Sequence, residues 1–208
     1  MRVIEKLRKS GIRGAWSFVC HRIIKTYLVK AHYLRMIIDP VSIDNKMKGF
    51  DLDVKELSYD NFLNGDPNVF TGAKMELYKQ RFKDPTYKAY GIIDNGRLVY
   101  STWISFHHLG MSVETKPVYL EPNEGYLEDS YCDPIARGRG LHSKMNIFRI
   151  HKIYESGRNR VIAIVQEGNI PAFKVQLKSG LEEIGSFYHG FVFGFKVNTL
   201  NKEEFDRK

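Results

Sequence analysis

An uninterrupted apolar run at residues 161–165 most constrains how this chain folds. Its sequence is Val-Ile-Ala-Ile-Val, and four of the five residues are β-branched. β-branched side chains suit an extended backbone. A strand that is apolar at every position is typical of the centre of a sheet that is covered on both faces. The run therefore predicts a layered α/β or α+β domain built around one sheet.

Extended and helical patterns alternate along the rest of the chain. Two apolar runs, residues 87–93 and 97–106, flank Asp94-Asn95-Gly96. Because Asn-Gly accommodates the positive φ angles of a tight turn, this segment predicts a β-hairpin. Further strands are predicted at residues 33–38, 50–54, 125–132, 181–188 and 191–197, and helices at residues 73–83, 141–154 and 170–178.

The composition is that of one soluble domain. The 208 residues are 43% apolar and 27% charged, which suits a chain that buries a core. Cys20 and Cys132 are too few for a disulfide scaffold, so a reducing compartment is expected. Basic side chains interrupt the apolar runs near the N-terminus, so neither a signal peptide nor a membrane span is predicted. We expect a cytoplasmic protein.

Most of the net charge of +8 belongs to an N-terminal arm. Residues 1–40 hold nine Lys/Arg and two acids, whereas the remaining 168 residues hold 23 basic and 22 acidic side chains. An apolar stripe recurs at helical spacing through residues 1–30: Ile12, Trp16, Val19, Ile23 and Tyr27. We interpret residues 1–45 as a basic amphipathic helical extension. It either packs on the domain or lies on an anionic membrane surface, and the sequence leaves both open.

A loop of small residues joins the predicted strand 125–132 to the predicted helix 141–154. From Cys132 to His142 it reads Cys-Asp-Pro-Ile-Ala-Arg-Gly-Arg-Gly-Leu-His. The first N–H groups of a helix and its dipole favour phosphate, and Arg137 and Arg139 add charge-assisted contacts. The loop has neither the Lys-Ser/Thr of a Walker loop nor the third Gly of a dinucleotide loop. We expect it to bind a pyrophosphate.

This loop resembles the coenzyme A loop of the GNAT N-acetyltransferase superfamily. The family pattern is Arg/Gln-x-x-Gly-x-Gly/Ala, preceded by an apolar residue, an Asp and a Pro. The matching residues are Cys132, Asp133, Pro134, Arg137 and Gly140. His142 stands where the family usually has a second Gly or Ala, so a side chain lies at a place where the backbone approaches the pyrophosphate.

A second resemblance follows at the family's spacing. Asn169-Ile170-Pro171-Ala172-Phe173 and Lys178-Ser179-Gly180-Leu181 look like the family's Asn-x-x-Ala helix that ends in Lys-x-Gly-Phe. Gln176 stands where many relatives carry a Tyr proposed to protonate the leaving thiolate, so the general acid is unassigned. The resemblance covers residues 85–197. It implies a GNAT-type, mostly antiparallel central sheet flanked by helices over residues 46–200, followed by a tail at residues 201–208.

The resemblance also implies what the protein binds and does. It implies acetyl-CoA or another acyl-CoA as co-substrate, without a metal, and acyl transfer to a primary amine of a small molecule, such as an amino sugar or a cell-envelope precursor. The backbone N–H near residues 131–132 is expected to stabilise the oxyanion. The expected CoA-binding residues are Tyr131, Cys132, Arg137, Gly138, Arg139, Gly140, Leu141, His142, Asn169 and Phe173.

Two carboxylates are candidates for the general base. Glu128 and Asp129 are adjacent on a predicted strand, so their side chains are expected on opposite faces, one of them facing the cleft. The alternative is that both only end a solvated strand. Tyr188 and His189 either line the acceptor side or flank a surface turn, and the turn is the favoured interpretation.

Other site chemistries are weaker readings of the sequence. Cys132 as a nucleophile would need an oriented imidazole, and a buried free cysteine is often a small hydrophobe. The histidines lack metal-ligand spacing. A rival function is a GNAT-fold binding module without catalysis, whose basic arm contacts anionic membrane or nucleic acid. The nearly neutral body disfavours nucleic acid as its partner. The sequence does not determine the acceptor, the acyl length or the oligomeric state.

Overall fold

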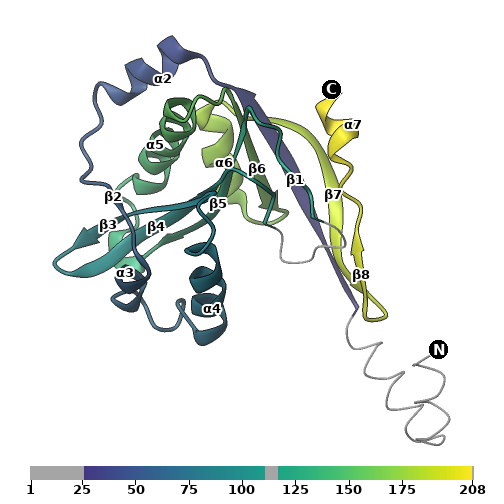
Figure 1. Ribbon diagram of the computed structural model, residues 1–208, viewed down its shortest axis with the longest axis horizontal. Helices are drawn as coiled ribbons and strands as arrows, with labels where there is room; N and C mark the ends of the chain where they lie inside the picture. Colours follow the sequence, from purple (N-terminus) through teal and green to yellow (C-terminus); the bar gives the residue numbers. More distant parts are fainter. Residues whose placement is uncertain (1–25, 111–116, 208) are drawn as a thin grey trace, which may run out of the picture.

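One mixed sheet organises the protein. The structure, a computed structural model, describes residues 26–110 and 117–207 (Figure 1). The eight strands lie in the order β2-β3-β4-β5-β6-β1-β7-β8. They are β1 (Tyr27–Ile37), β2 (Lys55–Glu56), β3 (Tyr87–Asp94), β4 (Arg97–Ser105), β5 (Glu124–Cys132), β6 (Arg160–Gln166), β7 (Glu182–Val192) and β8 (Phe195–Asn198).

Helices cover both faces of the sheet. They are α2 (Pro40–Met47), α3 (Tyr59–Leu63), α4 (Gly72–Arg81), α5 (Leu141–Glu155), α6 (Ile170–Ser179) and α7 (Lys202–Asp206). Helices α2, α5 and α6 lie on one side, called the α5 face, and α3 and α4 lie on the other, called the α4 face (Figure 1). Only β5 and β6 pair in parallel, and the other strand pairs are antiparallel. The predicted mixed, mostly antiparallel sheet between helices is confirmed.

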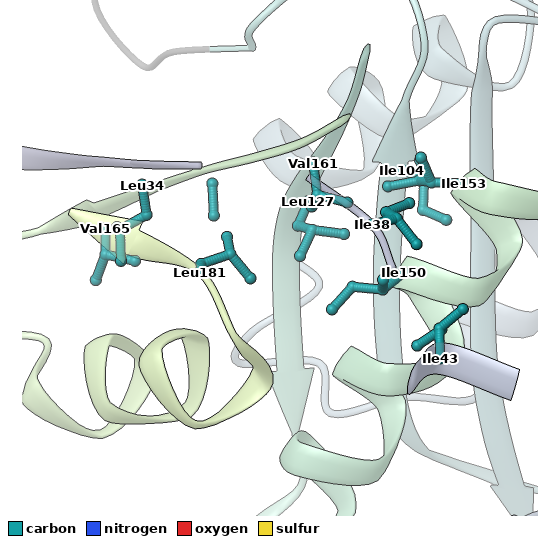
Figure 2. Close-up of a cluster of buried hydrophobic side chains, with 11 residues drawn as sticks. Leu34, Ile38, Ile43, Ile104, Leu127, Ile150, Ile153, Val161, Val165 and Leu181 are labelled. Carbon is teal, nitrogen blue, oxygen red and sulfur yellow. The ribbon is translucent and has the colours of Figure 1, made fainter. Parts of the chain in front are cut away.

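The apolar run at residues 161–165 is the middle of β6, between β5 and β1. Val161, Ala163 and Val165 belong to a core cluster that includes side chains of α5 (Figure 2). Ile162 and Ile164 belong to a different cluster, on the α4 face. Because alternate residues of a strand point to opposite faces, the run is apolar at every position in order to fill both cores.

The predicted hairpin is confirmed, and its turn has the expected conformation. β3 and β4 pair from Tyr87 opposite Ser105 to Asp94 opposite Arg97. Asn95 and Gly96, which connect them, both have positive φ, at 49° and 78°. These angles fit a two-residue turn whose twist matches that of the strands.

The N-terminal boundary differs from the prediction. Residues 27–37, which we placed in a helical extension with a strand only from residue 33, form the inner strand β1 between β6 and β7. The helical expectation is wrong for residues 27–30. In β1, Ala31, Tyr33 and Leu34 have no exposed surface, so this strand is part of the core. The rest of the predicted helical arm, residues 1–25, lies outside the described residues.

Two other segments also depart from the expected pattern. The alternation at residues 50–54 is not a strand, because Phe50, Leu52 and Val54 instead pack as irregular chain against a cluster that contains residues of α5. The expected tail contains α7, whose Phe205 is buried, with its ring 5.1 Å from that of Tyr33. Both segments use apolar side chains to cover the sheet without joining it.

Truncation of β1 tests whether it belongs to the core. Leu34→Ala removes a side chain with 0% exposure, and we expect a loss of about 2–5 kcal/mol in the free energy of unfolding. Ile37→Ala, in the same strand but 68% exposed, is the control and should change it by no more than about 0.5 kcal/mol. Urea denaturation measures both. Equal effects of the two variants would contradict the central position of β1.

Candidate functional site

The parallel strands β5 and β6 separate halfway along their length. Their pairing runs from Glu124 opposite Arg160 to Leu127 opposite Ala163. Beyond that register β5 continues to Cys132 and β6 to Gln166, and in the described part of the chain no further pairing joins the two strands. Strands that part leave main-chain N–H and C=O groups for other partners. We call this region the β5–β6 divergence.

A β-bulge in β5 accounts for the divergence. In the β4–β5 pairing Trp103 lies opposite Glu128 and Ser101 opposite Tyr131, so two residues of β5, 129 and 130, oppose Thr102 alone. Asp129 has a φ of 37°, which is unusual for a residue other than glycine. A bulge bends its strand and increases the local twist. β5 therefore turns away from β6 directly after their last paired residues.

The glycine loop follows β5 and leads into α5. A 3₁₀ turn, Pro134–Ala136, is followed by Gly138 and Gly140, with φ of 79° and 70°. Gly140 caps the N-terminus of α5 in the left-handed conformation. A Cβ built at either glycine would have no heavy atom within 4 Å. The glycines therefore provide the required backbone angles and leave the space beside the loop open.

Asp133 holds the base of this loop. Its buried carboxylate accepts the N–H of Ile135 at 3.1 Å and two guanidinium contacts from Arg97, at 2.9 Å from Nε and 2.7 Å from Nη2. Burial acts to raise the pKa of this carboxyl, but the Ile135 N–H and Arg97 outweigh it and the pKa is lowered. The side chain is thus an anion that fixes the turn.

The two loop arginines are exposed. Arg137 Nε donates to the carbonyl of Cys132 at 3.4 Å, and Arg139 donates to the carbonyl of Ile135 at 3.5 Å. Arg139 also lies 3.6 Å from the carboxylate of Asp94, itself exposed. These are weak, solvated contacts, so both guanidinium groups are available to an anion at the loop.

The side chains of Leu141 and His142, the first two residues of α5, point toward the protein interior. Leu141 is buried with Met145 and Phe148 in the core beneath α5. His142 Nδ1 lies 2.7 Å from the hydroxyl of Tyr100. Burial, and secondarily the charge of Arg149, lowers the pKa of His142 to about 4. The imidazole is therefore neutral at pH 7 and adds no positive charge to the loop.

The helix of the second resemblance, α6, lies on the same face. The side chain of Asn169 caps it by accepting the N–H of Ala172 at 3.3 Å, and Asn169 is exposed. Phe173 is half-buried, with its ring 4.8 Å from that of His32. These positions place both residues at the surface of α6 near the sheet, where the sequence predicted a binding role.

Gln176 has a structural partner. Its Oε1 accepts from Asn146 Nδ2 of α5 at 2.9 Å, and the same Nδ2 donates to Ser179 Oγ at 2.7 Å. Asn146 Oδ1 in turn accepts from buried Arg149 at 2.6 Å. The position that carries a tyrosine acid in many relatives here joins α5 to α6 through an amide network.

A cavity of about 740 Å³ lies on the α4 face, on the opposite side of the sheet from the loop. Its walls come from α4, β5, β6, β7 and β8. The ionisable side chains that line it include Arg81, Asp84, His108, Glu128, Asp129 and His189. Ile164 and Gln166, from the part of β6 beyond the paired region, also line it. The β5–β6 divergence therefore borders the cavity on the α4 face. The glycine loop, which follows β5, lies on the α5 face.

Glu128 and Asp129 do not point to opposite faces, which corrects the prediction. Both carboxylates contact the guanidinium of Arg81, which is 7% exposed. Asp129 also accepts the hydroxyl of Tyr78 at 2.7 Å and lies 3.2 Å from Lys74 Nζ. The bulge is the physical reason, because the positive φ at Asp129 interrupts the alternation of side chains. The alternative of two solvated carboxylates is wrong for Glu128, which is 5% exposed.

His189 lines the cavity, as the less favoured of the two sequence interpretations had it. We expected a turn there, but β7 continues to Val192 and the turn is at Phe193-Gly194. His189 is 5% exposed, and burial lowers its pKa, so its imidazole is neutral. Alternation with buried Phe187 was the signal that could have found it. Tyr188, on the other side of the strand, is exposed as expected.

Cys132 and Tyr131 have local packing roles in addition to their backbone positions. The Cys132 thiol is half-buried, its Sγ is 3.8 Å from the carbonyl of Asp133, and burial raises its pKa. A raised pKa disfavours the thiolate that a nucleophile needs. The ring of Tyr131 packs against Phe70 at 5.0 Å. Any role of these two residues in binding an acyl donor therefore rests on their main-chain groups.

The described residues hold neither a cluster of metal ligands nor a membrane-spanning helix. In residues 26–110 and 117–207, no group of three or more His, Cys, Asp or Glu side chains is placed to hold a metal ion. Over the same ranges no helix has the length and apolarity needed to cross a bilayer.

The fold matches solved structures of GNAT proteins, although no protein-family model and no curated protein matches the chain. A GNAT-family protein from Novosphingobium aromaticivorans is 14% identical with a TM-score of 0.55, covering 79% of this chain and 64% of its own. An acetyltransferase of the GNAT family from Colwellia psychrerythraea is 11% identical, with a TM-score of 0.51 over 78% and 55%. A tandem GNAT protein from the clavulanic acid biosynthesis pathway is 15% identical, with a TM-score of 0.53 over 76% and 51%.

These similarities concern the fold. The chain spans between half and two thirds of the length of those three proteins. Identities of 11–15% show a shared architecture and not a shared reaction. The GNAT-type fold that the loop and α6 motifs predicted is confirmed.

The buried His142 makes a testable contribution to stability. Its pKa is about 4 in the folded protein against 6.5 as the ordinary value, so between these values the unfolded state binds more protons. The free energy of unfolding therefore falls as the pH drops from about 6.5 to about 4. His142→Gln should show a shallower fall over that window in urea titrations at several pH values. His151→Gln, a half-buried histidine on the same helix, is the control, and identical slopes for wild type and His142→Gln would contradict the assignment.

Proposed function

We propose that this protein is an acyl-CoA-dependent N-acyltransferase that uses acetyl-CoA and a small primary amine. One observation carries the proposal. The β5–β6 divergence lies between a glycine loop suited to phosphate, on the α5 face, and a cavity lined by carboxylates, on the α4 face. A donor bound along the divergence brings its thioester to an acceptor in the cavity.

The donor side offers three kinds of contact. Main-chain N–H groups at Gly138–His142 bind the pyrophosphate at the N-terminus of α5, where the helix dipole favours an anion. Arg137 and Arg139 add charge. The pantetheine arm carries two amides, which pair with main-chain groups of the parted strands in the manner of an added strand. Tyr131 and Cys132 contribute main-chain groups to this pairing, and Asn169 and Phe173 line the arm from α6.

The acceptor side suits a cationic amine that must lose a proton. Glu128 and Asp129 attract the ammonium group, although Arg81 balances part of their charge. A primary amine with a pKa near 10 is mostly protonated at neutral pH, so a base is needed. The candidate bases in the cavity are these two carboxylates, the carboxylate of Asp84, and the imidazoles of His108 and His189.

The transfer itself then follows in two bond changes. The neutral amine nitrogen attacks the thioester carbonyl and forms the C–N bond, while the main-chain N–H groups near residues 131–132 stabilise the oxyanion. The nitrogen loses its extra proton to a base in the cavity, collapse of the intermediate breaks the C–S bond, and the CoA thiolate takes up a proton. Gln176 has no acidic proton to give. An ordinary thiol has a pKa near 8.5, so the thiolate is a competent leaving group without a dedicated acid.

A substitution in the glycine loop should weaken donor binding. Gly140→Glu places a carboxylate and a strained residue at a φ of 70°, in space that is open in the structure. We expect calorimetric titration with acetyl-CoA to show saturable binding to wild type and at least a tenfold weaker affinity for the variant, equivalent to about 1.4 kcal/mol. Gly72→Glu, at an open position on α4, is the control.

A milder double variant tests the loop even if Gly140→Glu does not fold. Arg137→Ala with Arg139→Ala removes two exposed cations without backbone strain, and we expect weaker CoA binding that becomes less dependent on salt. Wild type that fails to bind acetyl-CoA at millimolar concentration would contradict the proposed function. A protein that binds acetyl-CoA but releases no thiol with any amine would favour the rival binding module.

The cavity carboxylates should act on the acceptor alone. Asp129→Asn keeps the size of the side chain and tolerates the positive φ, but it removes the charge and one of the two acceptor oxygens. We expect KM for the amine to rise roughly tenfold while the affinity for acetyl-CoA stays unchanged. Glu56→Gln, an exposed carboxylate outside the cavity, is the control. Release of CoA thiol at varied amine concentration measures the effect. A change in acetyl-CoA affinity with no change in KM for the amine would place Asp129 on the donor side instead.

A further inference from the structure

Exposed apolar side chains gather at one corner of the sheet. Five large ones lie at the start of β1 and in the β7–β8 hairpin, and we call them the apolar corner: Tyr27 (51% exposed), Leu28 (49%), Tyr188 (48%), Phe193 (56%) and Phe195 (59%). Single exposed apolar residues are ordinary on a protein surface, but a contiguous group marks an interaction site. The question is what this corner contacts.

Strand register shows that the group is contiguous. Tyr27 pairs with Phe191 and Leu28 with Gly190, and Phe195 pairs with Val192 in the next strand. The rings of Tyr27 and Phe191 are 5.6 Å apart. Phe193 forms the hairpin turn, where its N–H donates to Thr26 Oγ1 at 3.0 Å. The turn and the first residues of β1 therefore form one end of the sheet (Figure 1).

Both sides of the sheet contribute to the corner. Side chains of paired residues lie on the same side of a sheet, and those of neighbouring residues alternate. Leu28 and Tyr188 thus share one side, because Leu28 pairs with Gly190 and Tyr188 lies two residues before Gly190. Tyr27 and Phe191 lie on the other. A projecting end with apolar groups on both sides fits insertion into a soft apolar medium better than a flat protein interface.

The charge around the corner is positive. Lys30 and Lys196 belong to the same strands, and Lys196 is exposed. Lys30 is paired with Glu167 at 2.9 Å, and the other carboxylate nearby, Glu183, pairs with His32. The 25 residues before Thr26 hold seven Lys/Arg and one Glu. Apolar and aromatic groups beside Lys and Arg are the composition of a surface that contacts anionic lipid.

We propose that the apolar corner docks the protein on an anionic phospholipid surface, with Phe193 and Phe195 entering the headgroup region. A second copy of this chain is a poorer occupant, because each copy carries a net charge of +8 and the two copies repel each other. Nucleic acid is also a poorer partner, since its phosphates make no apolar contact with exposed Leu and Phe side chains. The proposal does not depend on the acyl-transfer function.

Docking would place the acceptor cavity at the lipid surface. Lys196 of β8 and His189 of β7 line that cavity and belong to the same hairpin as Phe193 and Phe195. If the acyl-transfer function also holds, an amine carried on a lipid headgroup is then an acceptor of matching geometry.

Vesicle co-sedimentation with the full chain tests the docking. We expect wild type to bind vesicles of phosphatidylcholine mixed with phosphatidylglycerol, to bind pure phosphatidylcholine at least tenfold more weakly, and to be released by salt. Phe193→Asn with Phe195→Ser should lower binding to the mixed vesicles at least tenfold. Asn is chosen at residue 193 because it tolerates the φ of 50°.

A matched control separates the corner from general hydrophobicity. Val41→Ser with Leu63→Ser removes two apolar side chains that are 68% and 64% exposed elsewhere, and it should bind vesicles like wild type. Circular dichroism melting shows whether each variant is folded. Equal binding by both double variants, no vesicle binding by wild type, a change of oligomeric state with Phe193→Asn and Phe195→Ser, or stronger competition by duplex DNA than by anionic lipid would each overturn the proposal.

Discussion

The separation of β5 from β6 is the constraint on which the rest of the site depends. Two residues of β5 oppose Thr102 alone, and pairing with β6 ends after Leu127. If β5 and β6 stayed paired as far as Cys132, no opening would connect the two faces of the sheet. With the strands parted, the glycine loop and the carboxylate cavity, which lie on opposite faces, belong to one site.

Arg81 is the electrostatic centre of the cavity. The bulge turns Asp129 to the same side of the sheet as Glu128. Two carboxylates at such a short separation repel each other unless a cation lies between them. Arg81, flanked by the rings of Tyr78, Tyr87 and Trp103, supplies it. Removing one partner of such a buried group leaves a charge without compensation, which is strongly destabilising. The same ion pairs that hold α4 against β5 therefore shape the acceptor side.

The sequence predicted best the features set by local chemistry. Asn95-Gly96 requires its turn, the β-branched run requires a central strand, and Gly138 and Gly140 adopt the left-handed angles expected of a phosphate loop. Features set by distant partners were missed. The helical arm was extended over the first residues of β1, because the pairing of that strand with β6 and β7 cannot be seen in the local sequence. The bulge at residues 129–130 depends on the register with β4. The place of His189 inside β7 was not predicted, because the strand was expected to end at residue 188.

A crystal structure with acetyl-CoA bound tests the central claim most directly. The account predicts the pyrophosphate against the main-chain N–H groups after Gly138, the pantetheine arm between the parted strands, and the acetyl group at the bulge, facing Glu128 and Asp129 across the sheet. Electron density for the thioester on one face only, with β5 and β6 paired through residues 128–132 or the loop filled by its own side chains, would contradict it.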